Sequence, residues 1–120
     1  MAISQAMCTS FKVGLLDGVF KFGTGTTQTF KIALYTSSAT LSAATTTYST
    51  SNEATGAGYS AGGQALTIAA VPTSSGTTAY LDFSDVTWST STITARGALI
   101  YLADGLTNPA IAVLDFGGDK

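Results

Sequence analysis

Three stretches of the chain are predicted strands, residues 29–36, 64–71 and 77–83, and in the first and the third the side chains alternate between two faces with a two-residue period. A turn cluster that contains both proline and glycine, residues 72–76, separates the second stretch from the third. This spacing predicts that the second and third strands form a hairpin. Residues 85–88 would continue the third strand only if a bulge intervenes.

Two further apolar stretches lie in the last third of the chain, at residues 93–102 and 110–116. From Gly97 onward nearly every position is apolar, which is typical of strands that are covered on both faces. Turn residues at 103–109 join them, so we expect a central pair of antiparallel strands. The predicted core consists of the large apolar residues of all these strands, namely Phe30, Ile32, Leu34, Leu66, Ile68, Leu81, Phe83, Leu99, Ile100, Val113, Leu114 and Phe116.

The N-terminal segment, about residues 1–20, has a different period. Phe11, Leu15 and Val19 recur every four residues, and Thr9 or Ser10 is placed to cap a helix. Glycines limit the length of such a helix, so we expect it to end near residue 17. A helix this short is marginal in water unless it docks its apolar face, either on its own sheet or on a neighbouring subunit, so the alternative is an extended arm.

Residues 37–63 are rich in Ser, Thr, Ala and Gly and carry few large apolar side chains, Leu41, Tyr48 and Tyr59. We predict a long loop within a single domain. Loops of this length are commonly functional, so this segment is a candidate surface for binding a partner. The many short strands and the single short helix or arm predict an all-β fold, an antiparallel β-sandwich.

Composition narrows the possible functions. Charged residues make up 10% of the chain, against a usual share of about 25%, and 21 Thr and 13 Ser supply most of the polar surface. Histidine is absent and Cys8 is the single cysteine, so we expect no zinc site, no internal disulfide and no cofactor. Five scattered basic residues and a net charge of −2 argue against nucleic acid as a partner. No segment has the roughly 18 consecutive apolar residues of a membrane helix.

No motif in the chain indicates catalysis. Residues 56–61 have the letters of a dinucleotide-binding fingerprint, but they follow a polar stretch instead of a strand, and Gly62 and Gly63 would break the helix that the fingerprint needs. Asp82 and Asp85 would point to opposite faces of a strand, which does not suit a carboxylate pair. We therefore expect a protein that is not an enzyme.

Three stretches carry a resemblance to a known class of proteins: Phe11-Lys-Val-Gly-Leu-Leu-Asp-Gly-Val19 leading into Thr29-Phe-Lys-Ile-Ala-Leu-Tyr-Thr36, then Asn52-Glu-Ala-Thr-Gly-Ala-Gly-Tyr59 with Gly62-Gly63, and Thr94-Ala-Arg-Gly-Ala-Leu-Ile-Tyr101 closing on Asn108-Pro-Ala-Ile-Ala-Val-Leu-Asp-Phe-Gly117. In these the chain resembles small virion proteins of tailed bacteriophages. The resemblance implies a capsid decoration, or cement, protein with a jelly-roll type of sandwich. Such a protein is made in the host cytoplasm and is located in the virion.

The partners that this resemblance implies are the major capsid protein, other virion proteins and further copies of the same chain. A tail or head-fibre component is the alternative within the same class. A carbohydrate-binding sandwich is the alternative from another class, although a single tryptophan gives it little support. The interface candidates lie in the N-terminal segment, in the long loop and before the last two strands, and they are Met1, Ile3, Met7, Tyr48, Tyr59 and Trp88.

Overall fold

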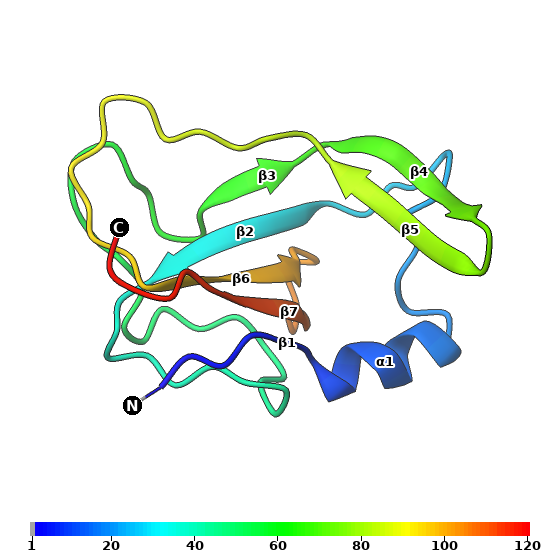
Figure 1. The fold of residues 1–120 in the computed structure, drawn as a ribbon, viewed down its shortest axis with the longest axis horizontal. Helices are drawn as coiled ribbons and strands as arrows, with labels where there is room; N and C mark the ends of the chain where they lie inside the picture. Colours follow the sequence, from blue (N-terminus) through cyan, green and yellow to red (C-terminus); the bar gives the residue numbers. More distant parts are fainter. Residues whose placement is uncertain (1) are drawn as a thin grey trace.

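The computed structural model describes residues 2–120, and within them the regular structure is mostly β, with one short helix (Figure 1). The elements are β1 (Ala6–Met7), α1 (Thr9–Leu16), β2 (Phe30–Tyr35), β3 (Gln64–Leu66), β4 (Ile68–Ser75), β5 (Thr78–Phe83), β6 (Gly97–Leu102) and β7 (Ala110–Asp115). Five strands form one antiparallel sheet in the order β1-β7-β6-β2-β3, and β4 and β5 form a separate hairpin. The predictions of a mostly β chain and of antiparallel pairing are confirmed.

Strands β2, β6 and β7 form the centre of the sheet. β6 pairs with β2 along its whole length, from Phe30 opposite Leu102 to Tyr35 opposite Gly97. Its other edge pairs with β7, with one register shift after Ile100. The expectation that the two C-terminal strands lie centrally is confirmed, because each has a hydrogen-bonded neighbour on both sides.

Apolar side chains pack on both faces of this sheet. The larger cluster includes Tyr35, Leu99 and Val113, all nearly or fully buried. A smaller cluster gathers around Leu34 and Ala98. Every one of the twelve residues predicted for the core belongs to one of these two clusters or packs against it.

A group of phenylalanines covers one end of the sheet and holds α1 in place. Phe11 of the helix contacts Phe20 edge to face, with ring centroids 4.8 Å apart, and Phe22 stacks on Phe30 at 4.4 Å. A Cβ atom on Gly14 would overlap the ring of Phe20. The helix therefore packs its Phe11 and Gly14 side against the protein.

The expected helix is confirmed, but its cap differs from the prediction, and the protein covers only part of its apolar side. Leu15 and Val19 are each 44% exposed, because the short side at Gly14 lets Phe20 approach the helix more closely. Cys8 occupies the N-cap position and makes no side-chain cap bond. The main-chain N–H of Thr9 donates instead to Ala43, so a neighbouring loop supplies an acceptor at the helix start.

The residues before α1 pair within the chain. Ser4 donates its main-chain N–H to Leu41, and Leu41 donates to Ala2. β1 adds to the edge of the sheet beside β7, with Met7 opposite Ala112. In this structure the N-terminal segment is thus a short edge strand that leads into a helix.

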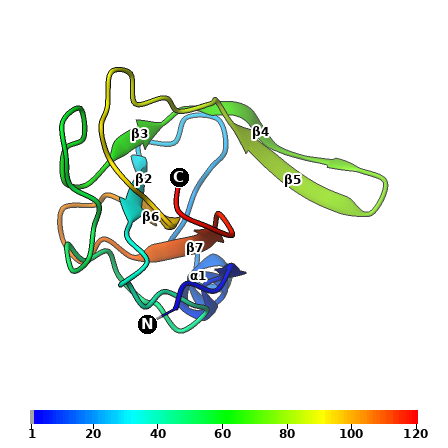
Figure 2. The same ribbon diagram turned by 60° about the vertical axis from the view of Figure 1, so that its left-hand side comes forward.

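The β4–β5 hairpin projects away from the rest of the molecule (Figure 2). Its pairing confirms the predicted hairpin, but the turn is shorter than predicted. β4 continues through Pro72 to Ser75, and the chain reverses at Gly76 and Thr77. Proline is tolerated here because β4 has a partner on one side only and its ladder contains register shifts on either side of Ala70. Residues 85–88 form no strand.

Candidate interaction site

A buried carboxylate ties three residues of the long loop together. Glu53 is 7% exposed. Its Oε2 accepts a hydrogen bond from the hydroxyl of Tyr48 at 2.7 Å. Its Oε1 accepts from the hydroxyl of Tyr59 at 2.7 Å and from the main-chain N–H of Gly62 at 2.8 Å. We call Glu53 and the four tyrosines around it, Tyr35, Tyr48, Tyr59 and Tyr101, the tyrosine–glutamate network.

The tyrosines of this network also bond to the main chain of the loop and the sheet. The hydroxyl of Tyr59 accepts the N–H of Leu34 at 2.8 Å, which satisfies a main-chain group of β2 beyond the end of its pairing with β3. Tyr35 donates to the carbonyl of Ser49 at 2.6 Å and Tyr101 to that of Gly62 at 2.7 Å. The rings of Tyr48 and Tyr101 stack with centroids 4.6 Å apart. The loop is therefore fixed by side chains although it contains no helix or long strand.

Burial and the nearby negative charge keep these phenols neutral. Desolvation raises the pKa of Tyr35, Tyr48, Tyr59 and Tyr101 above the ordinary value for tyrosine, and the charge of Glu53 raises each of them further. A hydrogen bond to the Glu53 carboxylate adds to the effect for Tyr48 and Tyr59. A neutral phenol can donate its hydrogen bond, so all four tyrosines remain donors, Tyr48 and Tyr59 to Glu53 and the other two to main-chain carbonyls.

Close backbone contact at the end of the loop requires glycine. Gly63 has φ +74°, and a Cβ atom there would collide with the carbonyl of Ile32 in β2. This contact brings the loop directly against β2 just before β3 begins. An open hollow of about 450 Å³ lies along residues 39–52 of the loop, and most of its lining is Ser, Thr and Asn, with no charged side chain.

The interface candidates of the sequence differ in how they are placed. Ile3 is 7% exposed and belongs to the larger core cluster, so it offers no surface in this structure. Met7 is 50% exposed. Met1 lies outside the described residues. Tyr48 and Tyr59 are partly buried in the tyrosine–glutamate network.

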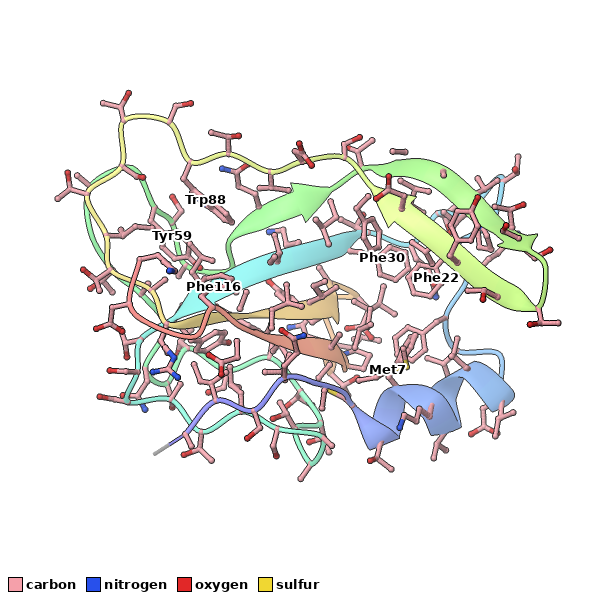
Figure 3. All side chains as sticks on the ribbon, in the orientation of Figure 1. Met7, Phe22, Phe30, Tyr59, Trp88 and Phe116 are labelled. Atoms are coloured by element: carbon pink, nitrogen blue, oxygen red, sulfur yellow. The ribbon has the colours of Figure 1, made fainter. Side chains whose placement is uncertain are left out.

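Trp88 is also partly buried. Its ring lies 5.8 Å from that of Tyr59 in a tilted arrangement, and both pack against the smaller core cluster (Figure 3). The two side chains come from distant parts of the sequence, the long loop and the segment between β5 and β6. The structure thus brings Tyr59 and Trp88 together as packing partners and separates them from Met7.

Exposed apolar side chains gather on β1, on α1 and at Val19, which follows the turn at the end of the helix. Leu16 is 91% exposed and Val13 is 56% exposed, an unusual degree for aliphatic residues of a helix. We define the α1 surface as these exposed apolar residues, Met7, Val13, Leu15, Leu16 and Val19. Two of them, Leu15 and Val19, belong to the apolar period of four residues in the sequence, and that period does not show which of its side chains a neighbouring phenylalanine will cover.

The residues considered for chemistry stay apart or enclosed. In residues 2–120 no three His, Cys, Asp or Glu side chains gather in a group that could hold a metal ion. Cys8 is fully buried, which raises the pKa of its thiol. Asp82 and Asp85 are exposed near the hairpin base. Residues 56–61 lie in turns that pack against residues 90–92 and open no helix.

Within residues 2–120, a surface ion pair and a turn also shift the pKa of an aspartate. Arg96 and Asp115 form a surface pair at 2.9 Å, and the hydrogen bond with Arg96 lowers the pKa of Asp115. Main-chain N–H groups of Asn108 and Leu106 lower the pKa of Asp104. Both arrangements lie at the ends of β6 and β7, where they stabilise the turn and the strand ends.

Sequence reasoning missed Glu53. An isolated acidic residue in a Ser- and Thr-rich stretch normally lies in solvent, and the only available signal was its position between two tyrosines. No helix of the described chain is long and apolar enough to cross a membrane. Comparisons with protein-family models, with curated proteins and with solved structures gave no match.

Proposed function

We propose that this chain is a structural protein of a tailed-bacteriophage virion, a capsid decoration protein that binds the major capsid protein, reinforces the head shell and performs no catalysis. The observation that carries the proposal is the α1 surface. Large exposed apolar side chains concentrated on one short segment mark sites of protein–protein contact. The sequence resemblance supplies the class of partner.

The chemistry of the rest of the molecule supports a binding role. A protein that binds by shape needs a rigid body and an apolar anchor, and it needs no titrating group at the contact. The tyrosine–glutamate network makes the long loop part of that body. Two exposed lysines, Lys12 within α1 and Lys21 shortly after it, would supply polar groups at such a contact.

We also propose that the fold is a β-sandwich of the jelly-roll type. In this proposal the five-stranded sheet is one layer, and the hairpin with the chain that leads from it to β6 forms the second. The phenylalanines between the sheet and the hairpin base support it, since Phe83 of β5 lies 6.3 Å from Phe22 and 6.4 Å from Phe30, centroid to centroid. An experimental structure of the protein bound to its particle would test the layering.

The direct test of the binding role uses one exposed leucine of the α1 surface and one outside it. Leu16 is 91% exposed and Leu106, in the loop between β6 and β7, is 86% exposed. Leu16→Asp should abolish co-sedimentation with capsids that lack the protein, because it places a charge at the apolar contact. Leu106→Asp is the matched control and should bind as the original protein does.

The outcomes separate the proposals. Equal binding by both variants would show that the α1 surface is not the contact. Recovery of the protein with tails instead of emptied heads would favour the tail or fibre alternative. Binding to glycans and not to capsids would favour the carbohydrate-binding alternative, for which the aromatic pair of Tyr59 and Trp88 would be the first site to mutate.

A further inference from the structure

The strand edges of this protein differ in how well they are protected. β1 is only two residues long. At the opposite edge the chain after β5 runs beside β3, where Ser84 donates its N–H to Thr67 and the side chain of Gln64 donates to Thr87. Short or covered edges of this kind prevent pairing with another chain.

The two edges of the protruding hairpin also differ. β4 contains Pro72 and register shifts on either side of Ala70, devices that disrupt an edge. β5 runs as a regular strand from Thr78 to Phe83, and β4 is its only strand partner among the described residues. Its outer edge therefore carries main-chain groups that no other strand satisfies.

The geometry of the hairpin turn determines which main-chain N–H and C=O groups of β5 point outward. Ser75 lies opposite Thr78 across a two-residue turn, where the flanking pair is hydrogen-bonded. Hydrogen-bonded and non-bonded pairs alternate along an antiparallel ladder. Ala79 and Leu81 thus direct their N–H and C=O groups away from β4, and Tyr80 between them directs its groups toward Thr73 of β4.

The side chains along this edge suit a neutral contact. Every residue from 71 to 80 is exposed, and the charge nearest to them on the hairpin is that of Asp82. Tyr80 is 49% exposed and is the aromatic residue in the outer part of β5, residues 78–80. An aromatic residue in the middle of an open strand gives a cross-strand partner a favourable contact.

We propose that β5 pairs with β5 of a second copy of this chain, antiparallel and about a twofold axis at Tyr80. In this register Ala79 lies opposite Leu81 of the second copy, so the outward N–H and C=O groups of both strands are satisfied. The two tyrosines face each other in a non-hydrogen-bonded pair. Asp82 lies opposite Thr78 of the second copy, which keeps the two carboxylates apart and leaves no like charges opposed.

The size of the contact sets its strength. Stable protein interfaces bury about 1,200–2,000 Å² in total, and two paired strands with their side chains bury less than that. We therefore expect weak association that depends on concentration and that becomes important when many copies are held close together. This contact is separate from the α1 surface, so it can be present or absent whatever the protein binds through that surface.

Disulfide trapping tests the register on the full chain. Tyr80→Cys should give a disulfide-linked dimer under mild oxidation, because opposed residues of a non-hydrogen-bonded pair have the short Cβ separation that a disulfide needs. Thr78→Cys is the control, since the two copies of residue 78 would lie far apart along the strands. Cys8 is fully buried and should take no part. Equal cross-linking of both variants, or of neither, would overturn the proposal.

Sedimentation equilibrium tests the contact without a disulfide. Ala79→Pro removes the outward N–H but leaves the bonds to β4, and it should raise the dimer dissociation constant by about tenfold or more. Ala79→Ser keeps the N–H and should sediment as the original protein does. If the original protein stays monomeric at the highest attainable concentration, self-pairing is wrong. This conclusion would hold even if Ala79→Pro weakened binding to capsids, because that result would assign the β5 edge to a different partner.

Discussion

Residues 37–63 and the β4–β5 hairpin are both rich in Ser, Thr, Ala and Gly, yet they differ in how firmly they are attached to the rest of the protein. The long loop lies against the sheet and is tied to it by the tyrosine–glutamate network. The hairpin has regular strands, yet every residue from 71 to 80 is exposed and apolar packing is confined to its base at Ile68, Leu81 and Phe83. The number of buried anchors, and not the content of regular structure, therefore decides which segment is part of the rigid body.

Replacing Glu53, the acceptor at the centre of the tyrosine–glutamate network, should give the largest loss of stability among the changes considered for the loop and the hairpin. Glu53→Ala leaves two phenol hydroxyls and the N–H of Gly62 without their acceptor in a buried site. We expect the free energy of unfolding to fall by about 3 kcal/mol or more. Urea denaturation at neutral pH measures it.

Asp85→Ala is the control for the lost charge, because Asp85 is exposed. It should change the stability by no more than about 0.5 kcal/mol. A loss of the same size in both variants would mean that the network does not fix the loop and that the comparison between the two segments fails.

Alkaline pH should loosen the same loop by a smaller, graded amount. The pKa of Tyr35, Tyr48 and Tyr59 is raised above the ordinary value of 10.0. As the pH rises above about 10, the phenols of the unfolded chain lose their protons before those of the folded chain. The contribution of these tyrosines to the free energy of unfolding is therefore fully present below about pH 10 and is lost as the pH rises toward their pKa in the folded protein. Urea midpoints measured from about pH 8 to about pH 12 test this.

Tyr48→Phe sharpens the alkaline test. It removes one phenol with a raised pKa, so the stability should fall less steeply above about pH 10 than in the original protein. A midpoint that stays constant across the range would show that the phenols titrate alike in the folded and unfolded chain, against the burial described above.

The free part of the hairpin should give the smallest effect on stability. Tyr80→Ser should change the free energy of unfolding by no more than about 0.5 kcal/mol, because the side chain is half exposed in the outer part of the hairpin, where every residue from 71 to 80 is exposed. Phe83→Ala at the base should cost about 2 kcal/mol or more, since Phe83 packs against Phe22 and Phe30. Equal costs would show that the outer hairpin is anchored as firmly as its base.

Local sequence patterns predicted much of the fold because strand periodicity reflects burial directly. The alternation at residues 29–36 and the apolar stretches at 93–102 and 110–116 correspond to β2, β6 and β7, the centre of the sheet. The hairpin was predicted as well. Its turn was misplaced at Pro72, because whether a proline interrupts a strand depends on whether its edge has a partner.

The site was much less predictable. Leu15 and Val19 are exposed because Phe20 folds back onto Gly14, a contact between residues that no helical period describes. The donors to Glu53 are Tyr48, Tyr59 and Gly62 of its own loop. They come together only because β2 and β6 hold the same loop from outside, through Leu34 on Tyr59 and Tyr101 on Gly62. A carboxylate surrounded by small polar residues has the same sequence signal whether it is solvated or buried.

The sequence alone determined which residues could be strands and which could form the core, since both follow from the spacing of apolar side chains along a single segment. Tertiary structure decided which polar segment is fixed and which projects, and which apolar side chains remain outside. Those outcomes depend on hydrogen-bond partners and packing neighbours that are distant in the chain, so they exist only once the sheet has formed.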